Sequence, residues 1–198
     1  MPRQQVVKLA IALYALWLFA GAALLLQADR QARAWQASNG LLPTAAQLTR
    51  LSYRRWEDML RACDDDLVTQ KAVDPQRMAD CAHLAHATPS GTRVPALALL
   101  VAAGAARHRG DITAAHAALA RSQAAAPFEG WLAARRVTHL RHLPRARDAL
   151  HGWALADLQL LAGARRFHDV LHETYRGRVD LRTWIAAALP AATGEGAP

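Results

Sequence analysis

An uncharged apolar run near the amino terminus constrains this chain of 198 residues more than any other feature. From Leu9 to Leu26 the sequence reads LAIALYALWLFAGAALLL, without a charged residue. A helix over residues 6–27 would span roughly 30 Å, the thickness of the hydrocarbon core of a bilayer. The run therefore predicts one transmembrane helix. The side chains expected inside the bilayer include Leu9, Leu13, Trp17 and Leu24.

Two other interpretations of this run compete with a membrane anchor. A cleaved signal peptide has an apolar region of about 7–15 residues and small residues just before the cleavage point. The run is longer than that, and Leu26 stands where a small residue would be needed, two positions before Ala28. A buried core helix is the third interpretation, and an unbroken apolar run at the very start of the chain argues against it. Length therefore favours the anchor.

The charges beside the run give the orientation of the anchor only weak support. Arg3 and Lys8 favour a cytoplasmic amino terminus, but Arg30 and Arg33 follow the run closely and reduce the asymmetry.

Composition favours helices throughout the rest of the chain. Hydrophobic residues make up 53% of the sequence and alanine is prominent among them; alanine is the strongest helix former and is depleted from strands. The formal net charge is +8, so a domain beside a membrane could attract anionic headgroups or an acidic polymer. A codon bias toward alanine and arginine explains the same composition. The arginines are scattered among acids without interleaved aromatics, which argues against nucleic-acid binding.

The two cysteines, Cys63 and Cys81, are placed to meet in a helical hairpin. Thr44 and Gln47 have the spacing of a capping box, which predicts a helix that runs on past Cys63. Asp74 followed by proline predicts the start of a second helix that carries Cys81. In an antiparallel pair both cysteines face inward, so they are candidates for a disulfide, and disulfides persist mainly outside the cytoplasm. The alternative is two buried, unpaired thiols.

A repeat-like segment occupies residues 96–127, ALALLVAAGAARHRGDITAAHAALARSQAAAP, which resembles a tetratricopeptide repeat. In that frame Gly110 and Asp111 form the turn between two helices, with Gly110 free to adopt a positive φ and Asp111 able to cap the second helix. The aromatic anchors usual in such repeats are replaced by leucine or alanine. A generic alanine-rich helical hairpin is the alternative.

Further helices are predicted over residues 129–142, 145–162, 165–175 and 180–189. The fold class is therefore all-α, with one N-terminal transmembrane helix followed by a tetratricopeptide-like helical-hairpin array. The domain boundaries follow from this pattern: a cytoplasmic head and anchor over 1–28, a linker or stalk over 29–42, the helical domain over 43–190 and a disordered tail over 191–198.

Polar clusters in the sequence do not form a recognisable catalytic or metal-binding motif. The pairs at His83 and His86, at His139 and His142, and at His168 and His172 have helical spacing, but none has an identifiable third ligand. Histidines on helix surfaces are the simpler interpretation. Asp64, Asp65 and Asp66 lack the spacing of a calcium loop and are expected to be solvated at the end of a helix. No phosphate-binding, dinucleotide-binding or nucleophile-elbow motif is present, so we expect neither enzymatic activity nor a cofactor or metal.

Several short segments near the carboxyl end suggest a family. The segments are Pro127-Phe-Glu-Gly-Trp131 leading to Arg135-Arg136, then Trp153 with Asp157, then residues 178–185, RVDLRTWI. They resemble the tetratricopeptide-like, membrane-anchored accessory proteins of bacterial exopolysaccharide biosynthesis, the VpsP-like group. The resemblance implies a single-pass protein of the bacterial inner membrane with a periplasmic domain. It transfers no functional residues, because the pattern that is shared is structural.

The expected function is a non-catalytic, membrane-anchored scaffold or adaptor of a bacterial envelope assembly, with exopolysaccharide biosynthesis or export as the resemblance implies. Its partners would be the lipid bilayer and other envelope proteins. Two alternatives stay open: a general envelope assembly factor that binds client peptides on a concave helical face, and a passive structural subunit of a larger membrane complex.

Overall fold

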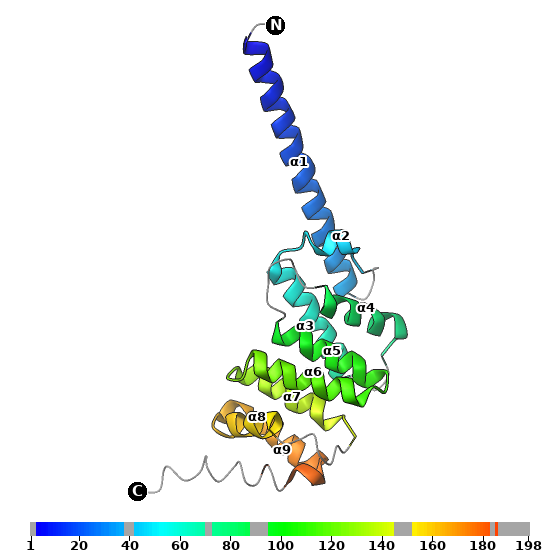
Figure 1. The fold of residues 1–198 in the computed structure, drawn as a ribbon, viewed down its shortest axis with the longest axis vertical. Helices are drawn as coiled ribbons and strands as arrows, with labels where there is room; N and C mark the ends of the chain where they lie inside the picture. Colours follow the sequence, from blue (N-terminus) through cyan, green and yellow to red (C-terminus); the bar gives the residue numbers. More distant parts are fainter. Residues whose placement is uncertain are drawn as a thin grey trace, which may run out of the picture. The chain divides into compact units, whose positions relative to one another are not determined.

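The computed structural model describes residues 3–37, 42–69, 73–87, 95–144, 152–182 and 185. These residues form helices joined by turns and short connections, and no strand occurs among them, as predicted for an all-α chain. The chain divides into two compact units, Met1–Met59 and Leu60–Pro198. Helix α3 crosses that boundary. Figure 1 shows the helices in sequence order.

The first unit contains α1 (Arg3–Gln36), α2 (Ala45–Leu48) and the beginning of α3 (Tyr53–Thr69). Helix α1 is 34 residues long and, over Ala10–Gln36, is long and apolar enough to span a membrane. Its large side chains are exposed as far as Leu26, whereas Ala28, Ala32 and Trp35 are buried. The helix therefore changes from an exposed apolar surface to a packed one within a single turn.

The structure differs from the linker expected over residues 29–42, because α1 continues as a helix to Gln36. Small and aromatic side chains at its end are buried, and Asp29 is joined to Arg55 of α3 by an ion pair with a nitrogen–oxygen distance of 2.7 Å. Arg55 also donates to the side chain of Gln36. Packing and paired charges thus hold this segment as helix.

One predicted helix, which was to begin after Pro43 and run past Cys63, is divided in two. The capping box at its start is present, since the side-chain oxygen of Gln47 accepts the N–H of Thr44 at 2.8 Å. A second cap follows, however: the Oγ of Ser52 accepts the N–H of Arg55 at 3.2 Å and starts α3. A capping box predicts where a helix begins but not how long it continues.

The second unit contains the rest of α3 and six further α-helices among the described residues. They are α4 (Pro75–His86), α5 (Ala96–His108), α6 (Ile112–Ala125), α7 (Gly130–Arg141), α8 (Trp153–Ala162) and α9 (His168–Gly177), with short 3₁₀ turns η1 (Arg165–Phe167) and η2 (Val179–Leu181). Asp74 caps α4 by accepting the N–H groups of Gln76 and Arg77, and Pro75 occupies its first turn, as predicted.

Helices α5 and α6 form an antiparallel hairpin at the centre of this unit (Figure 1). Nearly all of α5 is buried, which is the pattern of a helix surrounded by others rather than of a surface helix. Ser122 of α6 ties the pair together by donating its hydroxyl to the carbonyl of Ala96 at 2.9 Å. Such a hairpin is common to tetratricopeptide repeats and to generic helical pairs, so the tetratricopeptide-like array stays a prediction.

The remaining predicted helices agree only in part with the observed ones. The helix predicted over 129–142 is α7, and that over 165–175 corresponds to η1 and α9. The helix predicted over 145–162 is observed from Trp153, since residues 145–151 lie outside the described residues. The predicted helix over 180–189 lies mostly outside them too, as do the predicted tail over 191–198 and the segment 88–94.

Candidate functional site

The membrane-anchor residues predicted from the sequence all lie on α1. Leu13, Trp17 and Leu24 are exposed, and they belong to a continuous apolar surface of a kind that soluble proteins rarely expose to water. Leu9 lies in the same helix, and its side chain is outside the described ones.

The cysteine pair and the turn between two helices at Gly110 and Asp111 are present as predicted, whether or not the two helices form a repeat. The sulfur atoms of Cys63 in α3 and Cys81 in α4 are 2.07 Å apart, with their Cα atoms at 5.5 Å, so the pair lies at disulfide distance. Between α5 and α6, Gly110 has a φ of 79°. Asp111 caps α6, its carboxylate accepting the N–H of Ala114 at 2.9 Å.

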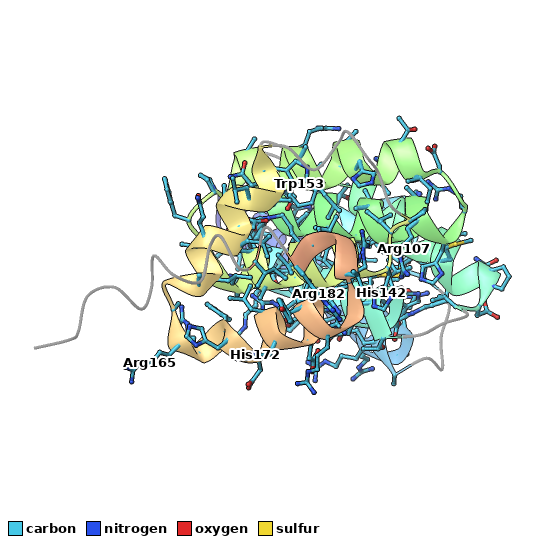
Figure 2. All side chains as sticks on the ribbon, turned by 90° about the horizontal axis from the view of Figure 1, so that it is seen from below. Arg107, His142, Trp153, Arg165, His172 and Arg182 are labelled. Carbon is cyan, nitrogen blue, oxygen red and sulfur yellow. A yellow bond between two sulfur atoms is a disulfide. The ribbon has the colours of Figure 1, made fainter. Side chains whose placement is uncertain are left out.

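The histidines that the sequence pairs do not come together as metal ligands. His172 is exposed on α9 (Figure 2), whereas the Nε2 of His168 faces the carbonyl of Ala162 at 3.1 Å. Glu173 accepts a hydrogen bond from Arg141 at 2.7 Å. Among the residues that the structure describes, no group of three histidine, cysteine or acidic side chains has a metal-binding arrangement.

The prediction that Asp64, Asp65 and Asp66 are all solvated at a helix end is wrong for Asp64. Helix α3 continues to Thr69, so Asp64 lies inside the helix and is buried. It bonds to Arg135 and to His139 of α7, with 2.7 Å between its Oδ1 and the Nε2 of His139. Burial raises the pKa of Asp64, but the hydrogen bond and charge of His139 and the charge of Arg135 outweigh it, so the net pKa lies below its ordinary value.

The contact between Asp64 and His139 has the chemistry of a catalytic dyad but not the access that one requires. The imidazole is 1% exposed. A Cβ added at Gly104 of α5 would approach the Cε1 of His139 to 2.9 Å, so α5 closes over the ring. A substrate cannot reach the imidazole in this packing. The dyad therefore acts as a tie between α3 and α7.

A small groove opens beside this tie and is lined by residues of α3, α5 and α7. We call it the Trp131 groove; it is lined by Arg61, Asp64, Asp65, Leu97, Trp131 and Arg135 and has a volume of about 150 Å³. Small-molecule pockets in proteins usually measure about 300–1,000 Å³, so the groove has room for one side chain of a partner rather than for a metabolite.

The surface around the groove combines aromatic and charged groups. The guanidinium of Arg61 lies 4.5 Å above the ring centre of Trp131, whose indole N–H donates to Glu129 at 3.0 Å. Arg135 pairs with Asp65 at 2.8 Å. Phe128, three residues before Trp131, is 86% exposed. Aromatic and arginine side chains of this kind are enriched where proteins bind one another.

Arginines that the sequence analysis assigned to composition occupy defined places inside the second unit. Arg136 and Asp157 are fully buried and form a two-pronged ion pair, with nitrogen–oxygen distances of 2.6 and 2.7 Å. Arg178 donates to the carbonyls of Leu140 and Leu143, at and beyond the end of α7. The only local signal for the first pair was an aspartate at position 157 on an otherwise apolar helix face.

The end of α3 receives a similar contact from α5. Both Arg107 and His108 hydrogen-bond to the carbonyl of Leu67, in the last turn of α3. Burial lowers the pKa of Arg107, and burial also lowers the pKa of His108.

No protein-family model, curated protein sequence or solved structure matches this chain. The fold and the site therefore define only a class: a helical domain that follows one apolar helix long enough to span a membrane.

Proposed function

We propose that the chain is a non-catalytic, membrane-anchored scaffold or adaptor of a bacterial envelope assembly, with its helical domain in the periplasm. The observation that carries the proposal is the uncharged run of α1, whose large side chains are exposed up to Leu26. Covering that surface requires a bilayer or other helices, and the length fits a bilayer. The bonded cysteines favour a compartment outside the cytoplasm.

The polar groups of the second unit support a binding role rather than catalysis. The buried charges Asp64, Arg136 and Asp157 are each engaged by other side chains of the same unit. The Trp131 groove, and the exposed Phe128 three residues before Trp131 in the chain, offer aromatic and charged side chains that fit a protein partner. Within this proposal, exopolysaccharide assembly is the system to test first, on the resemblance described above.

Affinity purification of the full chain from membranes in mild detergent tests the proposal. We expect a stoichiometric envelope partner to be recovered with the wild type and reduced by the double variant Phe128→Ser with Trp131→Ala. Tyr175→Ser, which alters another exposed aromatic of the same unit, is the matched control and should retain the partner.

The identity of the recovered partner separates the candidate assemblies. Polysaccharide polymerase, glycosyltransferase or export subunits support exopolysaccharide assembly, whereas cytochrome or pilus proteins support a general assembly factor. Recovery of the chain alone, with no stoichiometric partner, would overturn every scaffold role.

A further inference from the structure

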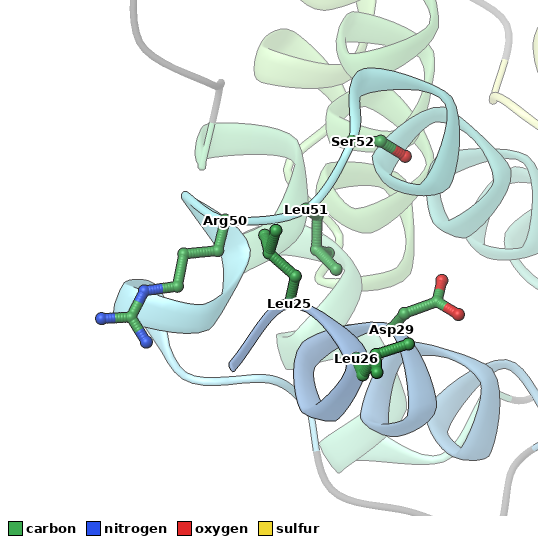
Figure 3. Close-up of a pocket in the computed structure, with 6 residues that line it drawn as sticks. All are labelled: Leu25, Leu26, Asp29, Arg50, Leu51 and Ser52. Atoms are coloured by element: carbon green, nitrogen blue, oxygen red, sulfur yellow. The ribbon is translucent and has the colours of Figure 1, made fainter. Parts of the chain in front are cut away.

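A cavity of about 440 Å³ lies in the first unit, where the exposed apolar surface of α1 ends. Its lining residues come from the end of the apolar run and from the connection between α2 and α3: Leu25, Leu26, Asp29, Arg50, Leu51 and Ser52 (Figure 3). This volume lies within the range of about 300–1,000 Å³ that is usual for small-ligand sites.

The lining has an apolar part and a polar part. Leu25 and Leu26 are exposed and are the last residues of the uncharged run. Asp29, one turn later, and Arg50 and Ser52 supply polar groups. If α1 crosses a bilayer, as proposed above, the leucines lie at the depth where acyl chains begin and the polar groups lie at the depth of the headgroups.

Arg50 carries the charge that is available to a ligand here. Its side chain is exposed and makes no hydrogen bond or ion pair within the described part of the chain. Figure 3 shows it extending away from the two leucines, with its guanidinium on the outer side of the group of lining side chains.

The carboxylate in the cavity does not oppose an anion, because its charge is already compensated. Asp29 accepts from the Nε of Arg33 at 2.9 Å and pairs with Arg55 at 2.7 Å. Residues 29–59 contain five arginines and three acids, so this segment has a net charge of 5 − 3, or +2. The lining of the cavity thus includes one arginine, Arg50, without an ion-pair partner among the described residues, and the apolar side chains of Leu25 and Leu26.

We infer that the cavity holds the headgroup of an anionic phospholipid, with its phosphate on Arg50 and the first carbons of its acyl chains against Leu25 and Leu26. The inference rests on the proposed membrane anchor. The anchor would place the cavity at the membrane interface, where lipid phosphates and acyl chains occur together. A lipid can contact both the polar and the apolar part of the lining, whereas a soluble anion can contact only the polar part.

Spin-labelled lipid in nanodiscs tests this with the full-length chain. Electron paramagnetic resonance measures the fraction of probe immobilised by the protein, with labelled phosphatidylglycerol compared with labelled phosphatidylcholine in phosphatidylcholine discs. We expect the wild type to immobilise the anionic probe preferentially. Arg50→Ala should reduce that preference by up to about fivefold, the effect of one arginine at a membrane surface, and Arg50→Lys should keep most of it.

Arg121→Ala, which removes an exposed arginine of α6, is the matched control and should leave the preference unchanged. Equal immobilisation of both probes by the wild type would overturn the lipid site, as would an Arg50→Ala variant that keeps the full preference. Loss of the preference on adding inorganic phosphate, but not chloride at equal ionic strength, would assign the cavity to a soluble anion. A chain that does not enter the discs would instead overturn the membrane anchor itself.

Discussion

Arginine side chains in the second unit donate hydrogen bonds to backbone carbonyls near the carboxyl ends of helices. The last carbonyls of a helix have no partner within the helix. Arg107 reaches Leu67 near the end of α3, and Arg178 reaches Leu140 near the end of α7. Arg136 approaches the carbonyl of Ala126, just after α6, at 3.3 Å. Part of the arginine content that composition alone attributes to codon use therefore has a structural role.

Mutation of the buried Arg136–Asp157 ion pair tests how much such an arginine contributes to stability. Asp157→Asn leaves the Arg136 guanidinium buried without a compensating charge, so we expect a loss of about 3–5 kcal/mol in the free energy of unfolding. Denaturant titration of the full chain in detergent, followed by circular dichroism, measures it. Glu173→Gln is the matched control: it breaks the exposed pair with Arg141 and should cost less than about 1 kcal/mol. Equal effects of the two variants would contradict the buried role.

His116 should make the stability of the second unit sensitive to acid. The imidazole is buried with no hydrogen-bond partner for either ring nitrogen among the described residues. Burial, and secondarily the charge of Arg178, lowers its pKa below the ordinary value of 6.5. The unfolded chain therefore binds a proton first as the pH falls, so stability is full above about pH 6.5 and decreases below it.

Thermal unfolding measured across this pH range checks that expectation. His116→Phe removes one of the histidines whose pKa is lowered and should make the decrease smaller, whereas His86→Phe, at an exposed position of α4, should leave it unchanged. A decrease of the same size in the His116→Phe variant would assign the acid sensitivity to other groups, such as His108, whose pKa burial also lowers.

At the scale of the helices, one close approach sets the packing of the second unit. Gly104 lies where α5 meets both α3 and α7, and an added Cβ there would come within 2.9 Å of Leu67 and of His139. Gly104→Ala should therefore lose about 1–3 kcal/mol through overpacking, despite the better helix propensity of alanine. At Gly177 an added Cβ meets nothing within 4 Å, so Gly177→Ala should be neutral or stabilising. Denaturant titration that ranks the two variants in the opposite order would contradict this packing.

The disulfide joins two helices across a sequence separation of 18 residues. Replacing both cysteines with alanine should cost roughly 3 kcal/mol, because the unfolded chain regains the freedom of the closed loop. Thiol labelling of protein purified from membranes measures the oxidation state independently of stability. Two reactive thiols in the native protein, with an unchanged melting temperature on reduction, would contradict the bonded pair.

Local signals in the sequence were sufficient to predict some helix boundaries but not the contacts between residues far apart in the chain. Asp74 with the following proline, and Gly110 with Asp111, define helix boundaries within a few residues of themselves, so they could be read directly. The partners of Asp64 stand 71 and 75 residues away, at Arg135 and His139. Spacing along a single helix carries no information about such pairs. The groove beside them could not be predicted for the same reason.

At the scale of the whole molecule, the proposed membrane anchor would decide in which compartment the helical domain works. A reporter enzyme that is active only outside the cytoplasm, fused after residue 190, should be active, and the same reporter fused before Arg3 should be inactive. The intact mass separates an anchor from a signal peptide, since the full chain has a mass of 21.5 kDa and cleavage would remove the apolar run. Activity of the amino-terminal fusion alone would reverse the proposed orientation.

If α1 spans a bilayer, as proposed, its continuity also links the orientation of the first unit to the thickness of that bilayer. The helix is unbroken from Arg3 to Gln36, so the exposed apolar part and the buried end with Ala32 and Trp35 belong to one stiff rod. A transmembrane helix that is longer than the local hydrocarbon layer tilts to match it. In a bilayer of different thickness, the buried end of α1 would turn through the same angle as the span. Lipid composition could thereby set the direction in which the first unit faces its surroundings.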